Sequence, residues 1–160
     1  MKKAEQQPIL ILGIGNILLG DEGVGVHVVR EMEKNEYPDH VEILDGGTGG
    51  FHLLSVFQQF KKIILIDASL DNGKPGTINL FKPKYSIDFP KVLSSHDIGL
   101  KDLIESSALL GFMPEVSLIT VSINNDQPIN MELSEEVKAS IPEVIALIDK
   151  IITELLEIGK

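Results

Sequence analysis

Residues 10–29 read LILGIGNILLGDEGVGVHVV, and this stretch decides the fold that we expect. An apolar run ends in a turn broken by glycines, which is followed by the acidic pair Asp21 and Glu22 and then by a helix start rich in small residues. Strand–turn–helix units of this kind place the turn at one edge of an α/β sheet, beyond the carboxyl ends of the strands, where ligands bind. Two carboxylates in the turn favour a metal ion or a proton acceptor, because a site for nucleotide phosphates would avoid their negative charge.

The composition of the 160 residues limits the classes of protein to which the chain can belong. Apolar residues make up 43% and aromatic residues 5%, so the core is built largely from Ile, Leu and Val, as in a parallel sheet covered on both faces. A net charge of -10 would repel a phosphate backbone and argues against a nucleic-acid partner. The lack of cysteine removes disulfides, thiolate metal sites and a Cys nucleophile. With no signal-like N-terminal segment and no apolar run of membrane-spanning length, we expect a cytoplasmic protein without a membrane partner.

Apolar segments alternate with amphipathic ones along the chain. Strands are expected at residues 9–14, 41–44, 63–66, 76–81 and 116–123, and helices at 23–34, 53–60 and 97–110. A capping box from Ser140 to Glu143, with Pro142 in the first turn, predicts the start of a last helix. The pattern predicts a single three-layer α/β/α domain over residues 1–160. Its mixed sheet should hold about five strands, mostly parallel, with the alternating segment 76–81 as the antiparallel one.

An acidic residue follows or closes each of the first three expected strands. Glu22 follows the first strand, Asp45 closes the second and Asp67 closes the third. If the strands are parallel, these side chains meet along one edge of the sheet. Because like charges repel when they are brought together and partly desolvated, we expect a bound cation among them.

His96 is the fourth candidate for this site. Ser94 and Asp97 resemble the cap and first turn of a helix, which places His96 near a helix N-terminus. The positive end of the helix dipole disfavours the imidazolium form and leaves a lone pair for a metal. Two carboxylates and one imidazole suit nickel, zinc or a similar divalent ion, with open positions for water or a substrate group.

Four segments, in order along the chain, share a resemblance to one family. They are GIGNILLGDEGVG at 13–25, EILDGGTGG at 42–50, ILIDA at 64–68 and SSHDIGL at 94–100. Together they resemble the signature segments of the hydrogenase maturation endopeptidases, which remove a C-terminal extension from the large subunit of nickel–iron hydrogenases. The resemblance implies that Glu22, Asp67 and His96 are both the metal-contacting and the catalytic residues. Ser95 stands where family members often have proline.

The resemblance also implies the metal and the partner. Nickel would arrive already bound to the cysteines of the hydrogenase large-subunit precursor, and the free protein could hold another divalent cation instead. The complex with the precursor would be transient, and no stable partner is expected. We expect a water molecule or the scissile carbonyl to be polarised by the metal while a nearby carboxylate accepts the proton.

Several residues also have simpler interpretations. Asp21 could be a helix N-cap, and Asp45 could begin a glycine-rich turn. Together with Asp45, the run Gly46, Gly47 and Thr48 is a candidate contact for an extended substrate tail. The alternative function is a non-proteolytic nucleotide- or metal-binding module of the same architecture. Against a dinucleotide site, Leu18 occupies the position of the third glycine in the usual turn.

Overall fold

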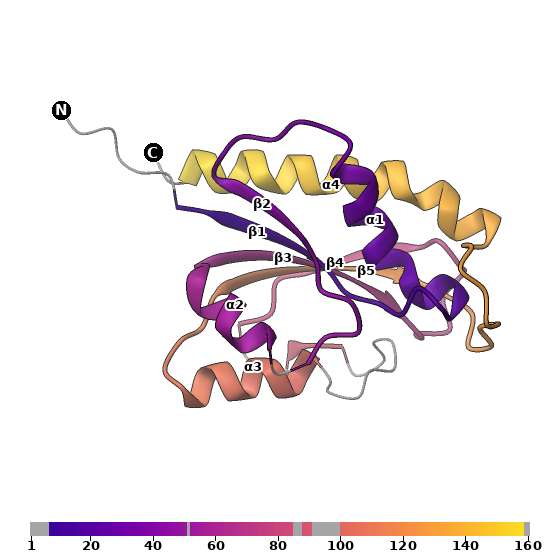
Figure 1. Ribbon diagram of the computed structural model, residues 1–160, viewed down its shortest axis with the longest axis horizontal. Coiled ribbons are helices and arrows are strands. Elements are labelled where there is room, and N and C mark those ends of the chain that lie inside the picture. Colours follow the sequence, from indigo (N-terminus) through magenta and orange to yellow (C-terminus); the bar gives the residue numbers. More distant parts are fainter. Residues whose placement is uncertain (1–6, 51, 85–87, 91–99, 159–160) are drawn as a thin grey trace.

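The computed structural model describes residues 7–50, 52–84, 88–90 and 100–158, and its strands form one five-stranded sheet (Figure 1). The strands are β1 (Ile9–Gly13), β2 (Val41–Asp45), β3 (Lys62–Ser69), β4 (Ile78–Phe81) and β5 (Glu115–Ser122). They lie in the order β2-β1-β3-β5-β4. All neighbouring pairs are parallel except β4 and β5, which are antiparallel. The expected mixed, mostly parallel sheet is therefore confirmed, including the antiparallel strand.

Helices cover both faces of this sheet, as Figure 1 shows. They are the short 3-10 helix η1 (Gly20–Gly23) and the α-helices α1 (Val24–Met32), α2 (Leu53–Gln59), α3 (Leu100–Leu109) and α4 (Glu135–Ile158). Helices α1 and α4 lie on one face, and α2 and α3 lie on the other (Figure 1). Across the described ranges, no helix combines the length and the apolar character that crossing a bilayer requires.

Each face of the sheet has its own hydrophobic core. Side chains alternate between the two faces along a strand, so β3 contributes Ile64 and Ile66 to the core under α1 and α4. The same strand contributes Ile63 and Leu65 to the core under α2 and α3. Burial on both sides explains why this strand reads as a continuous apolar run in the sequence.

The start of the last helix differs from the prediction. Helix α4 begins at Glu135, so Pro142 lies inside it and does not occupy its first turn. The hydroxyl of Ser140 donates to the carbonyl oxygen of Val137 (2.6 Å) and does not cap a helix N-terminus. The predicted capping box is wrong because the true start is stabilised by a residue far away in the sequence, described below.

Gly25 lets α1 begin directly against the sheet. A Cβ atom at this position would lie 2.3 Å from the carbonyl oxygen of Ile66 and 2.4 Å from that of Ile14. Because both neighbours are backbone atoms of the sheet region, Gly25→Ala is expected to lower the free energy of unfolding by about 3 kcal/mol. Urea denaturation would measure the loss.

Gly111→Ala is the matched control for this change. Gly111 has a φ of +87°, but a Cβ there would meet no atom within 4 Å, so only backbone strain would be introduced. If Gly25→Ala lowers the free energy of unfolding no more than Gly111→Ala does, α1 can move away from the sheet at little energetic cost.

Candidate active site

The carboxylates of Glu22 and Asp67 lie at the carboxyl edge of the sheet. Strand β1 leads into the turn that carries Glu22 in η1, and Asp67 lies in the last part of β3. The amide of Ile14 donates to the carbonyl oxygen of Ile66 (2.9 Å), and η1 contacts β3. Both residues are buried, with exposed fractions of 6% for Glu22 and 0% for Asp67. The structure thus brings these two predicted site residues to the same edge.

The position of Asp67 along β3 shows which face its side chain belongs to. Leu65, two residues earlier, packs in the core under α2 and α3, so Asp67 points to that same face. Its Oδ1 accepts a hydrogen bond from the amide of Ala68 (2.8 Å). Helix α3 begins at Leu100, which is buried in the same core. The carboxylate therefore faces the side of the sheet on which α3 starts.

Thr120 is a further polar residue beside Asp67 that was not singled out from the sequence. It pairs with Asp67 in the register of β3 and β5, and its exposed fraction is 1%. Its hydroxyl is buried and makes no hydrogen bond within the part of the chain that the structure describes. The signal in the sequence is a hydroxyl in an otherwise apolar strand, at the position next to the acid. The register of the two strands thus places a buried hydroxyl beside the residue that carries the acid.

The third predicted ligand, His96, lies outside the described residues. Within the described ranges there is no group of three or more His, Cys, Asp or Glu side chains that could hold a metal. The three-residue site therefore stays a prediction, of which the structure places the two carboxylates.

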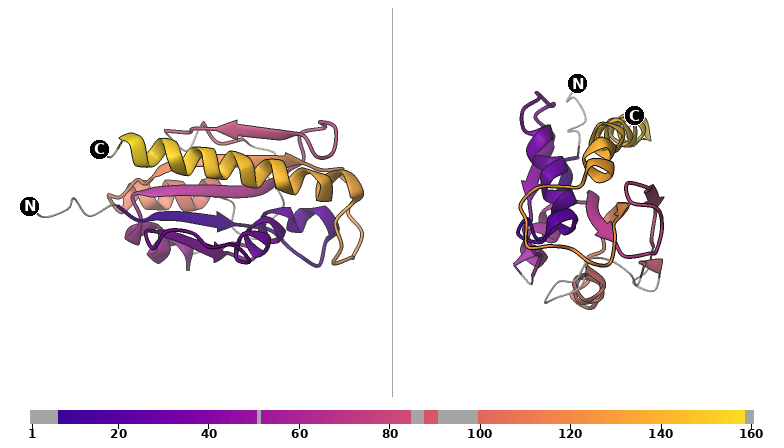
Figure 2. Two further views of the ribbon diagram at one scale, coloured as in Figure 1. Left: turned by 90° about the horizontal axis from the view of Figure 1, so that it is seen from above. Right: turned by 90° about the vertical axis from the view of Figure 1, so that its right-hand side faces the viewer.

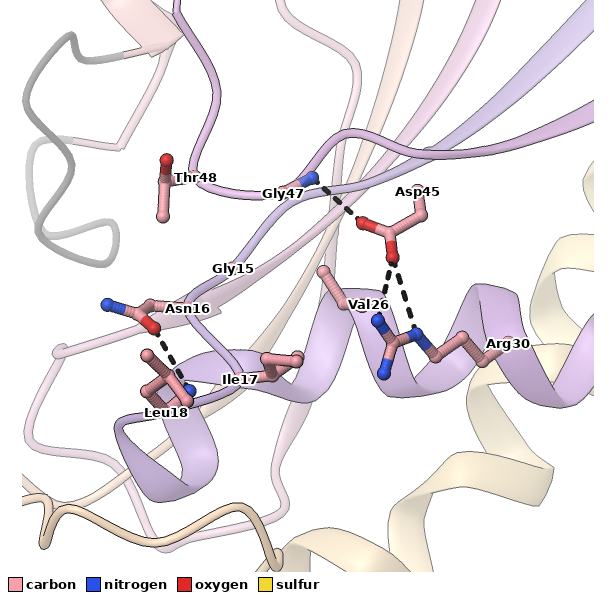
Figure 3. A pocket seen from close by; sticks show the side chains of 9 residues that line it. All are labelled: Gly15, Asn16, Ile17, Leu18, Val26, Arg30, Asp45, Gly47 and Thr48. Carbon is pink, nitrogen blue, oxygen red and sulfur yellow. Dashed lines mark hydrogen bonds and ion pairs between the residues drawn. The ribbon is translucent and has the colours of Figure 1, made fainter.

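Asp45 has a different set of contacts (Figure 3). Its Oδ2 forms an ion pair with Arg30 of α1, at 3.2 Å from Nη2 and 3.3 Å from Nε. Its Oδ1 accepts a hydrogen bond from the amide of Gly47 (2.9 Å), two residues further on. Asp45 thus begins a turn and neutralises an arginine, which confirms the turn interpretation.

A cavity of about 300 Å³ lies between the turn after β1 and the loop after β2. The amide of Gly15 donates to the carbonyl oxygen of Gly47 (2.8 Å) and ties the two walls together. The lining residues are Gly15, Asn16, Ile17, Leu18, Val26, Arg30, Asp45, Gly47 and Thr48 (Figure 3). The lining combines apolar side chains, the uncharged polar side chains of Asn16 and Thr48, and one paired acid and base, so the space can accept an uncharged part of a peptide. Of the four predicted substrate contacts, Asp45, Gly47 and Thr48 line the cavity and Gly46 is not among its lining residues. The role of all four in substrate binding stays a prediction.

Asp21 stabilises the start of α4 and does not cap the helix that follows it. Its carboxylate accepts hydrogen bonds from the amide (2.7 Å) and the hydroxyl (2.8 Å) of Ser134, the residue before α4. The amide of Asp21 in turn donates to Oε1 of Gln127 (2.7 Å). Neither η1 nor α1 has a side-chain cap, so the N-cap interpretation is wrong. The two neighbouring acids of the turn therefore have different roles in the fold: Asp21 stabilises the start of α4, and Glu22 is buried in η1, which contacts β3.

Helix α1 carries two basic residues, His27 and Arg30, and only Arg30 is mostly charged at pH 7. Burial and the nearby positive charge of Arg30 lower the pKa of His27. His27 is therefore mostly neutral at pH 7, and Arg30 supplies the cation that faces the Asp45 side of the cavity.

A model of the hydrogenase maturation protease family matches residues 26–151. The chain belongs to this family. The Hydrogenase 2 maturation protease of Escherichia coli is 34% identical to it over 155 residues, which cover 94% of this chain and 92% of the relative. A putative hydrogenase maturation protease of Methanocaldococcus jannaschii is 32% identical over 161 residues, which cover 92% and 96%.

Solved structures of hydrogenase maturation proteases share the fold. The hydrogenase maturating endopeptidase HybD of Escherichia coli superimposes with a TM-score of 0.82 at 33% identity, over 92% of this chain and 93% of that one. The maturation protease HybD of Thermococcus kodakarensis gives a TM-score of 0.74 at 27% identity, over 90% and 98%. The resemblance found in the sequence is confirmed, and with it the assignment as a protease, a hydrolase. The alternative of a nucleotide- or metal-binding module is not favoured.

Proposed function

We propose that this hydrogenase maturation protease recognises nickel in the large-subunit precursor of a nickel–iron hydrogenase and then removes the precursor's C-terminal extension. The observation that supports this proposal best is the placement of two buried carboxylates, Glu22 and Asp67, at the same ligand-binding edge of the sheet. Two acids at one edge favour the binding of a cation. In this proposal that cation is the nickel bound to the substrate.

Glu22, Asp67 and His96 are the proposed contacts to the nickel of the substrate. Carboxylate oxygen and imidazole nitrogen are ligands that suit nickel, and open coordination positions remain for groups of the substrate. The chain contains no cysteine, so any thiolate ligands come from the precursor. Three ligands without a thiolate would hold a resting divalent cation only weakly in the free protein, which fits a complex that forms and dissociates.

Hydrolysis needs a water molecule to attack a polarised carbonyl and a group to accept its proton. In the proposed mechanism, one carboxylate of the Glu22 and Asp67 pair accepts that proton, because both lie within the same edge of the sheet. The hydroxyl of Thr120, buried beside Asp67, can orient the water or the carboxylate. No Ser or Cys nucleophile takes part in this scheme.

The test compares nickel-loaded and nickel-free forms of candidate large-subunit precursors, each incubated with the wild-type protein. Mass spectrometry of the products should show loss of a C-terminal peptide from a nickel-loaded precursor alone. Equal trimming of both forms would contradict recognition through nickel. If every candidate precursor stays intact in both forms, the cleavage itself is wrong, and a binding function is favoured.

A further inference from the structure

A group of exposed apolar side chains lies beside the turn that carries Glu22. Leu18 is 55% exposed, Ile129 is 90% exposed and Met131 is 58% exposed. We call these three residues the apolar rim. Single exposed apolar residues are ordinary on protein surfaces, but a fixed group at the edge of a site indicates a contact surface.

Hydrogen bonds of the backbone hold the members of the apolar rim together. The amide of Asn130 donates to the carbonyl oxygen of Leu18 (3.0 Å), and the amide of Gly20 donates to the carbonyl oxygen of Asn130 (2.7 Å). These bonds form an isolated parallel bridge between Leu19 and Asn130. Ile129 and Met131 flank Asn130 in the chain, so residues more than a hundred positions from Leu18 are fixed next to it.

The segment that carries Ile129 crosses the carboxyl edge of the sheet on its way from β5 to α4, as the right-hand view of Figure 2 shows. Asp21 fixes its far end through Ser134, and Gln127 fixes its middle through the amide of Asp21. Ile129 is therefore exposed on a segment that hydrogen bonds hold in place at its middle and at its far end. The turn of Leu18 connects this segment to the cavity, because Leu18 also lines the cavity.

The charges around the apolar rim specify the chemistry of a partner. Residues 124–132 include the exposed acids Asp126 and Glu132 and contain no Lys or Arg. Met131 also lines a pocket with one base, Lys138, and with the acids Glu31, Glu132 and Glu135, so acids outnumber bases there. A complementary surface therefore combines apolar side chains with basic ones at its margin. Electrostatic attraction of this kind would speed the encounter, while burial of Leu18 and Ile129 would hold the complex together.

We propose that the apolar rim is a docking surface for the large-subunit precursor, which it contacts through an apolar patch with basic neighbours. This inference rests on the proposed function, which makes the substrate a whole protein. Such a substrate must cover the edge that holds Glu22 and Asp67, and the apolar rim borders that edge. The rim then determines how firmly the precursor binds and takes no part in the bond-breaking step.

Ile129→Ser, alone and combined with Leu18→Ser, tests this proposal in the trimming assay with a nickel-loaded precursor that the wild-type protein cleaves. We expect KM to rise by about tenfold or more for the single variant, with kcat unchanged, because an isoleucine buried on binding is replaced by a polar residue. Asp126→Asn combined with Glu132→Gln should reduce the dependence of KM on salt concentration. Thermal unfolding of every variant should match that of the wild type, since these side chains are exposed.

Leu109→Ser is the matched control. Leu109 is 89% exposed, but it ends α3 at the other edge of the sheet, near the start of β5. An unchanged KM for Ile129→Ser, or an equal rise for Leu109→Ser, would overturn the docking surface. Analytical ultracentrifugation gives a further test. If the wild-type protein is a dimer and the Ile129→Ser variant is a monomer, the apolar rim binds a second copy of this chain, and the docking surface for the precursor is overturned. A wild-type protein that trims no precursor would contradict the proposed function and not the rim in particular.

Discussion

Replacing Asp67 by asparagine is expected to abolish trimming of the nickel-loaded precursor while the domain still folds. The asparagine side chain has nearly the same shape, and its Oδ1 can keep the hydrogen bond from the amide of Ala68. What is lost is the negative charge of a side chain that is 0% exposed at the edge of the sheet. Because that charge is proposed to contact nickel or accept a proton, the rate of release of the C-terminal peptide should fall by about 10²–10⁴-fold.

Asp39→Asn is the matched control for this variant. Asp39 is exposed and precedes β2, at the amino edge of the sheet. Its neutralisation removes the same charge from the molecule without touching the proposed site, so trimming should continue at the wild-type rate. Wild-type activity of Asp67→Asn would remove this carboxylate from the mechanism, provided that its thermal unfolding is also normal.

His96→Ala is expected to have an effect of similar size on trimming. A neutral imidazole is proposed to contact the nickel carried by the substrate, and alanine offers no lone pair in its place. His96 stands in a polar stretch of sequence, so its removal should change the free energy of unfolding by less than about 1 kcal/mol. Single-turnover trimming of the nickel-loaded precursor and thermal unfolding would separate the two effects.

His40→Ala serves as the control for His96→Ala. His40 lies just before β2, at the edge opposite the carboxylates, and should be dispensable for trimming. If His96→Ala trims the precursor as fast as the wild type, the histidine has no role in the mechanism. The case for cleavage guided by a metal would then rest on Glu22 and Asp67 alone.

Local patterns in the sequence were sufficient for most of the architecture. The apolar runs of β1 and β3 are long enough and sufficiently unbroken to indicate buried parallel strands, and the alternation in β4 indicates an edge strand. Once the strands are parallel, Glu22 and Asp67 must share one edge, and the structure agrees. The site was therefore predictable to the extent that it follows from strand direction.

Contacts between distant segments could not be predicted in this way. The bond between Asp21 and Ser134 joins residues 113 positions apart, and no local pattern indicates it. The capping box at Ser140 fits the rules of helix starts, yet the carboxylate of Asp21 allows the helix to begin earlier. The ion pair between Arg30 and Asp45 likewise depends on how α1 packs beside β2.

The bond from Asp21 to Ser134 also affects how the molecule can open. A turn with Glu22 at its centre and the first turn of the long C-terminal helix share one pair of hydrogen bonds, so neither can loosen without releasing the other. Such shared bonds make two segments into one cooperative unit in local unfolding. Two segments that are distant in the sequence thus maintain the geometry of the proposed site jointly, and a change that loosens the start of the last helix is expected to reduce the order around Glu22.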